Sequence, residues 1–185
     1  MGKIDNAVHE VKRLVKKYKT RNPYELCDAM DIMIRYKDTG PQIKAYFIVM
    51  ARIKSIVLNS CICDAVQKIL VAHELGHAVL HEELALHNGF QELDMFGTAS
   101  SAEYEANLFA AELLIKDDEL LELLNDETMS FFAMAQELCI PVEMLDFKFR
   151  VLKNKGYHIE PQLFLQPNFL KNDIEGMYDD DWSGG

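Results

Sequence analysis

The chain has 185 residues, of which 49% are apolar and 26% charged, and its formal net charge at pH 7 is −11. This length and composition suit one globular domain with a sizeable core, and so acidic a chain binds phosphate poorly, which argues against nucleic acid as a direct partner. No stretch reaches the roughly 18 apolar residues of a membrane span, and the N-terminus lacks the apolar core of a signal peptide, so we expect a cytoplasmic protein with no membrane partner.

The first predicted element is a basic amphipathic helix in segment 1–21. Its apolar side chains recur at helical spacing: Ile4, Val8, Val11, Val15 and Tyr18. The segment carries seven Lys or Arg side chains against two carboxylates, a net charge of +5, so the remaining residues carry −16. The basic face either docks on an acidic surface or is simply solvated, which is the commoner reason for such a run of charge.

A second helix and a small sheet follow. Asn22, Pro23 and Glu25 supply a capping residue, a first-turn proline and an acid at N3, which predicts a helix that continues to about Met30. Three short segments rich in β-branched and aromatic residues predict an antiparallel sheet: Ile32 to Tyr36, Ala45 to Met50 and Ser55 to Leu58. Neither Asn-Gly nor Asp-Gly joins the last two strands, so the sequence does not define their turn.

The next predicted helix, Val66 to Leu84, contains the pentapeptide His-Glu-Leu-Gly-His at residues 73–77. The helix is apolar on nearly every face, which is typical of a central, buried helix. Asp64 and Gln67 have the spacing of a capping box that would start it. Gly76 costs a helix about 1 kcal/mol relative to alanine, which predicts that another backbone passes close to this position.

The pentapeptide predicts a metal site. Side chains four residues apart lie one turn apart on the same face of a helix, so His73 and His77 can hold one metal ion, for which we expect zinc. A third protein ligand and one water would complete a tetrahedral catalytic site, and Glu74 is placed to take a proton from that water. The alternative is a buried helix whose two histidines bond only to protein groups, but the apolar context favours the metal site.

The third ligand is sought in a second apolar helix, Ser100 to Ile115. On the helical wheel of this segment, Glu103 lies on the face that should pack inward. Glu105 lies with Glu112 on the face that should be exposed to solvent. We therefore expect Glu103 to bind the metal and Glu105 to be solvated. The alternative for Glu103 is a capping box with Ser100.

Further polar residues are expected beside these ligands. Asn107, one turn beyond Glu103, can hold the second nitrogen of a metal-bound histidine, or is simply a polar residue at a packing edge. His81 lies about 6 Å further along its helix than His77, too far to share the ion, so it fits better as an orienting residue or as a cation at the helix C-terminus. Tyr104 or His81 could steady an oxyanion, and spacing does not choose between them. The other histidines are expected at the surface: His9, His87 and His158.

Two helices, Thr128 to Leu138 and Val142 to Lys155, complete the predicted body, with Pro141 at the start of the second. They look like a helix-turn-helix, but their acidic side chains argue against DNA contact: Glu137, Glu143 and Asp146. From Asp173 onward the sequence has the acidic, glycine-containing composition of a mobile tail.

The four cysteines are Cys27, Cys61, Cys63 and Cys139. They lack the spacing of a zinc ribbon, so we expect free thiols in a reducing compartment. Cys61 and Cys63 precede the motif helix, which leaves an additional metal or redox function open.

Three segments of the sequence point to one family. They are His-Glu-Leu-Gly-His at 73–77, Glu-Tyr-Glu-Ala-Asn-Leu-Phe-Ala-Ala-Glu-Leu-Leu at 103–114, and the apolar strand that ends in Leu-Asn-Ser at 58–60. Together they resemble the ImmA/IrrE metallopeptidases, over roughly residues 22–157. The resemblance implies a gluzincin-like zinc site in which Glu103, at the start of the Glu-x-x-Ala-Asn pattern, is the third ligand. Lys116 stands where family members often have proline, a departure that touches a helix end and leaves the site intact.

The family includes regulators of mobile elements and phages that cleave helix-turn-helix repressors, as well as a stress-response protease. We therefore expect an α+β fold, a mostly helical zincin-like domain with a small three-stranded antiparallel sheet. The expected organisation is a basic N-terminal helix at 1–21, a metallopeptidase domain at 22–157 and a C-terminal extension with an acidic mobile tail at 158–185.

The expected function is that of a zinc-dependent endopeptidase that cleaves a helix-turn-helix transcriptional repressor. One zinc ion would be held by His73, His77 and Glu103 and would act as a Lewis acid, with Glu74 as general base and water as nucleophile. An edge strand near Ser55 to Asn59 could hold the substrate by β-augmentation. The alternative is a non-catalytic regulatory protein that docks a transcription factor or toxin, but a merely structural metal site would not need Glu74.

Overall fold

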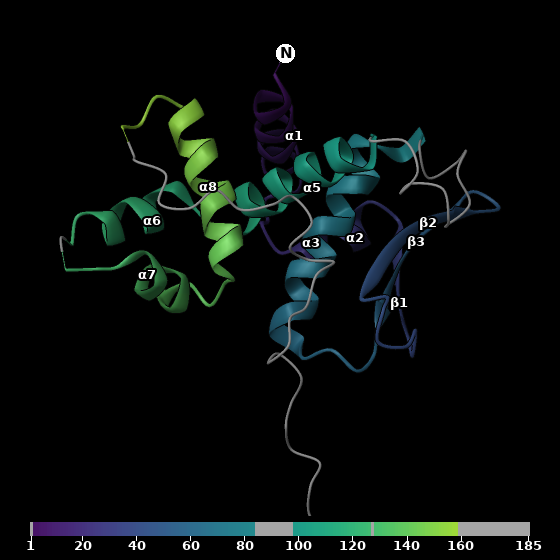
Figure 1. Cartoon of the computed structure of the whole chain (residues 1–185). Helices are drawn as coiled ribbons and strands as arrows, with labels where there is room; N and C mark the ends of the chain where they lie inside the picture. Colours follow the sequence, from purple (N-terminus) through teal and green to yellow (C-terminus); the bar gives the residue numbers. More distant parts are fainter. Residues whose placement is uncertain (1, 84–97, 127, 159–185) are drawn as a thin grey trace, which may run out of the picture.

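The computed structural model describes residues 2–83, 98–126 and 128–158 of the chain. Two long helices, α3 (Asp64–Leu80) and α5 (Thr98–Leu114), cross at its centre. The sheet and α2 lie on one side of this pair, α6, α7 and α8 lie on the other, and α1 packs against α5 (Figure 1). The fold is α+β and mostly helical, as predicted. His87 and the predicted acidic tail lie outside the described residues.

Helix α1 (Lys3–Tyr18) is amphipathic, as its apolar spacing predicts. It buries one face in the main core, with the side chains of Ala7, Val8, Val11 and Leu14. Its first turn also contacts the last helix, because Asn154 Nδ2 donates a hydrogen bond of 2.7 Å to Asp5 Oδ1. The N-terminal helix is therefore part of the folded body.

Helix α2 (Pro23–Ala29) begins as predicted, with the Asn22 side chain accepting a hydrogen bond from the Tyr24 amide. The linker before it is anchored as well. The Arg21 guanidinium donates to the carbonyl oxygens of Glu112 and Leu113, at 2.8 and 3.2 Å, and thereby satisfies two otherwise unpaired groups at the C-terminal end of α5.

The sheet contains β1 (Ile32–Lys37), β2 (Ala45–Met50) and β3 (Ile53–Asn59) in the order β1-β3-β2. The β2–β3 pair is antiparallel, but β1 runs parallel to β3, so the sheet is mixed and the prediction of a purely antiparallel sheet was wrong in this detail. The loop 38–44 is long enough to carry the chain past the position of β3, which then returns between its two neighbours.

This strand order changes which strand has a free edge. Because β3 pairs on both sides, Ser55 to Asn59 is not an edge segment, and the predicted site of β-augmentation was wrong. Within the described residues the outer strands are β1 and β2, and β2 also contacts α3.

A two-residue turn joins β2 to β3. Met50 and Ile53 are register partners, and the residues between them, Ala51 and Arg52, have φ values of 50° and 67°. Positive φ at both central positions is the requirement of a type I′ hairpin turn, which Asn-Gly satisfies with least strain. The turn could not be recognised in the sequence, because neither Asn nor Gly occupies its central positions.

Helix α3 begins at Asp64 with Cys63 as its N-cap, so the predicted capping box was wrong. The Gln67 side chain instead donates a hydrogen bond of 2.5 Å to the carbonyl oxygen of Ile62, which ties the loop to the first turn. The helix is buried along most of its length and ends at Leu80, with His81 as its C-cap. It is therefore the central, buried helix that its composition predicts, although it is shorter than the predicted span.

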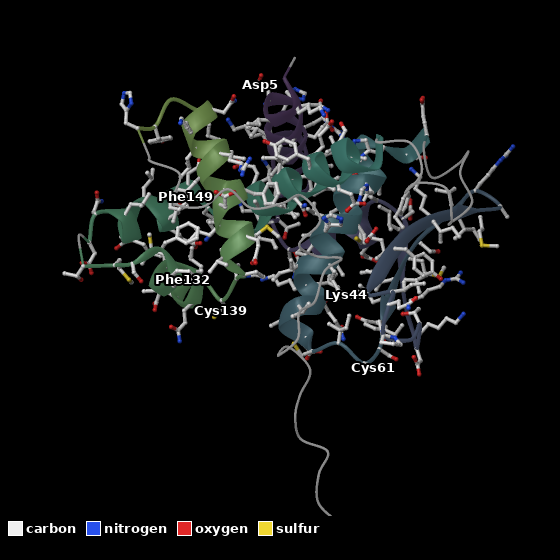
Figure 2. All side chains as sticks on the ribbon, in the orientation of Figure 1. Asp5, Lys44, Cys61, Phe132, Cys139 and Phe149 are labelled. Atoms are coloured by element: carbon white, nitrogen blue, oxygen red, sulfur yellow. The ribbon has the colours of Figure 1, made fainter. Side chains whose placement is uncertain are left out.

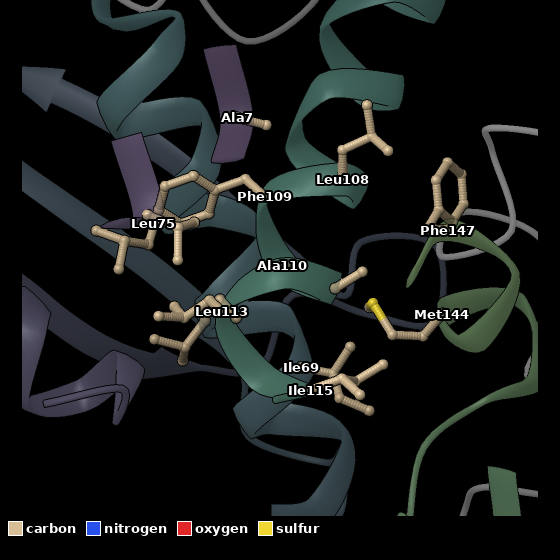
Figure 3. Close-up of a cluster of buried hydrophobic side chains, with 14 of the residues drawn as sticks. Ala7, Ile69, Leu75, Leu108, Phe109, Ala110, Leu113, Ile115, Met144 and Phe147 are labelled. Carbon is tan, nitrogen blue, oxygen red and sulfur yellow. The ribbon is translucent and has the colours of Figure 1, made fainter. Parts of the chain in front are cut away.

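Helices α3 and α5 cross at Gly76. A Cβ atom added to Gly76 would lie 3.1 Å from Ala106 Cα, 3.2 Å from Ala106 O and 3.3 Å from Phe109 Cβ. The prediction of a close backbone at this position is confirmed. Phe109 and Leu75 lie side by side next to this crossing, and Ala7 of α1 lies near them (Figure 3).

The C-terminal part of the described chain consists of α6 (Asp117–Leu124), α7 (Phe131–Glu137) and α8 (Val142–Asn154). Helix α6 was not predicted, although the acidic residues of its first turn are a helix signal in the sequence. The side chain of Ser130 caps α7. Asp146, one of the acids that argue against DNA contact, is fully buried and paired with Arg150 at 2.8 Å.

A buried ion network joins α8 to α5 and α6. Lys148 is fully buried and contacts Glu112 at 2.6 Å and Asp117 at 2.5 Å. Lys155 contacts the same two carboxylates, at 2.7 and 2.6 Å. No helix within the described ranges has the length and apolar character that crossing a membrane requires.

Candidate metal centre

Three side chains from the two central helices converge on one point. His73 Nε2 and His77 Nε2 on α3 are 3.1 Å apart. Glu103 on α5 places Oε2 at 3.2 Å from His73 Nε2 and Oε1 at 3.5 Å from His77 Nε2. Among the described His, Cys, Asp and Glu residues, these three form the group that could hold a metal ion together.

The backbone explains why the three meet. Four-residue spacing on α3 brings the two imidazoles onto one face, and the crossing at Gly76 brings α5 close enough for Glu103 to reach them. Helix α5 already begins at Thr98, so Ser100 lies within the helix and not at its cap. This position argues against the alternative in which Glu103 closes a capping box with Ser100.

The ligand atoms lie close enough together to share one ion. Zinc binds nitrogen and oxygen ligands at about 2.0–2.2 Å, which places tetrahedral ligand atoms roughly 3.4 Å apart. The two imidazole nitrogens are 3.1 Å apart, and each contacts a different oxygen of Glu103, at 3.2 and 3.5 Å. One ligand atom from each of the three residues lies within 4.8 Å of the other two. Three protein ligands leave a fourth position open. Of the three side chains, His77 is the most exposed, at 17%.

The charge state of Glu103 suits a ligand. Burial on its own raises the pKa of this carboxyl group, but its hydrogen bonds and charge interactions with His73 and His77 together outweigh burial and hold the pKa well below its usual range. The carboxylate is therefore ionised at neutral pH, and two imidazoles with one carboxylate form a donor set that binds divalent zinc.

Asn107 and Glu74 flank this group. Asn107 is fully buried, and its Oδ1 lies 2.8 Å from Nδ1 of His73. If Nδ1 of His73 donates in this bond, its Nε2 is left with a lone pair directed at the metal position. Glu74 follows His73 on α3 and is 8% exposed.

The sequence analysis missed a second acid–histidine contact next to the centre. Glu105 was expected to be solvated, but its side chain is 15% exposed, and Oε2 lies 3.5 Å from Nε2 of His81. The same wheel argument placed Glu112 in water, and it is almost fully buried. Both expectations were wrong because α1 and α8 pack against the faces of α5 that a single helical wheel treats as free.

Tyr104 and the other histidines were the remaining candidates from the sequence. Tyr104 points toward α8, where its ring packs against Phe147 with centroids 5.7 Å apart. Burial, and next the proximity of His77, lower the pKa of His81 below its ordinary value. His9 and His158 are exposed, as expected.

All four cysteines are free thiols, as predicted. Figure 2 shows Cys61 at the connection from β3 to α3 and Cys139 at the turn between α7 and α8. Neither belongs to the three-residue group, so within the described chain a cysteine metal site gains no support.

Comparisons with known proteins agree with this geometry. The sequence model of the family described as Peptidase M78, IrrE N-terminal-like domain, matches residues 27–150. Immunity region protein 2 of Bacillus phage phi105, which is described as uncharacterised, is 34% identical over 139 residues, covering 75% of this chain and 85% of the phage protein. Metallopeptidase ImmA of Bacillus subtilis strain 168 is 32% identical over 118 residues, covering 63% of this chain and 67% of ImmA. The converging residues on α3 and α5 all lie within the matched range.

Proposed function

Since this chain belongs to the IrrE N-terminal-like family of metallopeptidases, we propose that it is a zinc-dependent endopeptidase whose metal ligands are His73, His77 and Glu103. The observation that carries the proposal is the convergence of these three side chains, whose ligand atoms all lie within 4.8 Å of one another. A site with three protein ligands keeps one position for water, which is the arrangement of catalytic zinc sites.

The proposed chemistry assigns one task to each side chain. Bound zinc supplies a Lewis acid and lowers the pKa of a coordinated water. Glu74 takes a proton from the attacking water and delivers it to the departing amine. Asn107 fixes the ring of His73 by accepting a hydrogen bond from its Nδ1–H group, so that Nε2 keeps its direction. Tyr104 is directed to the contact with α8, so we do not assign it to the oxyanion.

We further propose that the substrate is a helix-turn-helix transcriptional repressor. One relative is named for a phage immunity region and the other is named a metallopeptidase, which supports a protein substrate in the control of a mobile element. Such a repressor acts in the cytoplasm, and the proposal places the peptidase there as well. The N-terminal helix and the C-terminal helices are the surfaces outside the site that remain for docking.

The free edge of β2 is the proposed binding strand for the scissile segment. Within the described residues β2 pairs on one side only, with β3, and it packs beside α3, which carries the two histidines. An extended peptide adds to such an edge by main-chain hydrogen bonds, which hold almost any sequence. Selectivity for one repressor therefore requires contacts away from this strand.

The alternative is a regulatory protein that binds its target without cutting it. The two functions differ in their need for Glu74, because a structural metal site needs no base. We expect Glu74→Gln to keep zinc content and fold while the rate of repressor cleavage falls at least about 100-fold, since an amide cannot accept the water's proton.

The measurement is single-turnover cleavage of the purified cognate repressor, with zinc content determined on the same samples. Casein is the control substrate, and we expect it to be cut slowly because selectivity resides in docking. A Glu74→Gln protein that still cuts the repressor, or still relieves repression in cells, would favour the binding function. Rapid digestion of casein would point to a general peptidase.

A further inference from the structure

A second acid–histidine pair stands one helical turn beyond the proposed metal ligands. His77 and Glu103 are in contact at 3.5 Å, and His81 and Glu105 repeat that contact at the same distance. The side chains of the second pair are 13% and 15% exposed. A buried ion pair is weak evidence for a stabilising function, because desolvation offsets most of the attraction between the charges.

The second pair touches the metal centre through His77. The rings of His77 and His81 have centroids 5.7 Å apart and are tilted by 52°. The backbone amide of His81 also donates a hydrogen bond of 2.9 Å to the carbonyl oxygen of His77. The described ring neighbours of His77 are thus His73 on one side and His81 on the other.

The two proposed histidine ligands are supported differently. His73 is held through its own Nδ1 by Asn107, at 2.8 Å. The ring of His77 is instead held by packing against His81. Within the described residues, the orientation of the His77 ring therefore depends on His81, so the group that fixes His81 also affects the metal.

Glu105 is well placed to fix His81 because it is itself anchored. Ser101 Oγ donates to Glu105 Oε1 at 3.3 Å, and Lys3 Nζ of α1 lies 3.9 Å from the same oxygen. Lys3 also donates a hydrogen bond to Ser101. Oε1 is therefore engaged by α1 and α5, which leaves Oε2 directed at the imidazole on α3.

We propose that Glu105 is a positioning residue of the metal centre: it holds His81 against His77 and thereby keeps the His77 ring directed at the metal. The inference rests on the proposed function, because it takes His73, His77 and Glu103 as the ligands. It gives the family's metal site a supporting carboxylate in addition to its ligand carboxylate. It also gives His81 an orienting function in place of a direct bond to the ion.

The test is the affinity for zinc, measured by competition with a chromophoric chelator, which needs no substrate. We expect Glu105→Ala to weaken zinc binding about 10-fold, the lower end of the range for groups that support metal ligands. Glu105→Gln should restore most of the affinity, because its amide oxygen still accepts from the imidazole. Glu122→Ala, which removes an exposed carboxylate on α6, is the matched control and should leave the affinity unchanged.

A double-mutant cycle asks whether Glu105 acts through His81. If it does, His81→Ala weakens zinc binding, and adding Glu105→Ala to that variant weakens it no further. Additive losses would overturn the proposal, because they would mean that Glu105 acts on the ion by its charge alone. Equal losses in Glu105→Gln and Glu105→Ala would overturn it as well.

Two further variants separate this inference from the proposed function. His73→Ala and Glu103→Ala should abolish tight zinc binding. If both keep it, the ligand set itself is wrong. If both lose it while Glu105→Ala binds zinc like the wild type, the ligand set stands and only the positioning inference fails. Lys3→Ala removes one anchor of Glu105 and leaves the bond from Ser101, so it should weaken zinc binding less than Glu105→Ala does; an equal loss would show that anchoring of α1 is the real effect.

Discussion

At the scale of single residues, Gly76 determines how closely the two metal-binding helices approach. Its missing Cβ atom leaves room for the backbone of Ala106, and a methyl group there would lie 3.1–3.2 Å from that backbone. A flexible side chain could move away from such a contact, but a packed helix backbone cannot do so locally. The helices would have to separate, and Glu103 would move with α5.

We expect Gly76→Ala to destabilise the protein although alanine is the better helix former. The intrinsic gain is about 1 kcal/mol, whereas overpacking of a core costs about 1–3 kcal/mol; because the contacts are to backbone, we expect the upper end of this cost and a net loss of about 2 kcal/mol. Urea denaturation measures the free energy of unfolding, and zinc competition should show weaker binding in the same variant. A more stable variant with unchanged affinity would mean that the crossing is looser than described.

At the scale of elements, the β2–β3 turn is strained by its own residues. Ala51 and Arg52 both have positive φ, a conformation that costs a residue with a Cβ atom. We expect the double variant Ala51→Asn and Arg52→Gly to raise stability by roughly 0.5–1 kcal/mol, because Asn-Gly adopts the type I′ turn with least strain.

The melting temperature of the turn variant measures this gain, and its zinc affinity is the control, since the turn lies far from the ligands in sequence. Exchanging the new residues, with Gly at 51 and Asn at 52, should stabilise less. A lower melting temperature in the Asn-Gly variant would show that the Arg52 side chain makes a contact that outweighs the relief of strain.

Elements whose burial follows one clear period could be predicted from the sequence. Helix α1 shows this. The strands were predictable from their β-branched and aromatic composition, the central helices from their apolar content, and Glu103 from its position on the inward face of α5. The approach of His73 to His77 could be predicted because their four-residue spacing is a local property of one helix. The close approach at Gly76 could be predicted because glycine destabilises a helix, so a glycine inside a buried helix indicates that another backbone lies close to it.

The predictions that failed concern features that are determined by how the elements pack against one another. Glu105 and Glu112 look solvated on a wheel of α5 alone, but α1 and α8, distant in sequence, cover those faces. The position of β3 between β1 and β2 depends on where a loop crosses, and no periodicity records that. The capping residue of α3 was misplaced because the Gln67 side chain bonds to the preceding loop and not to a cap.

At the scale of the whole molecule, the buried ion network fixes the C-terminal helices to α5. Lys148 sits between Glu112 and Asp117, and Lys155 contacts both acids from the other side. Breaking one partner of a buried network leaves a carboxylate poorly compensated. The network therefore stabilises the packing of the C-terminal helices only when all of its charged side chains are present.

We expect Lys148→Ala to lower the free energy of unfolding by about 3 kcal/mol, because the buried carboxylate of Glu112 loses a partner. Lys153→Ala, an exposed lysine on the same helix, should change stability by less than about 0.5 kcal/mol. Urea denaturation of both variants at neutral pH provides the comparison. Equal effects would show that Lys155 compensates alone.

Acid should weaken the same network. Burial raises the pKa of Asp117, but Lys148 and Lys155 outweigh it and hold the pKa below its ordinary value. A depressed pKa contributes stability above the unfolded value, near 4, and this stability is lost as pH falls through the lower folded value. Asp117→Asn should therefore lose less stability on acidification than the wild type does.

The contact between Asn154 and Asp5 has a consequence for how the chain folds. It closes a loop of 149 residues, whereas His73 and Asn107 are only 34 residues apart. Short loops close at lower entropic cost, and contacts distant in sequence slow folding. During synthesis the metal-binding helices can pair before α8 has emerged from the ribosome. Helix α1 packs mainly against α5, so its apolar stripe stays uncovered until α5 has been made, and that stripe is what a chaperone would meet on the nascent chain.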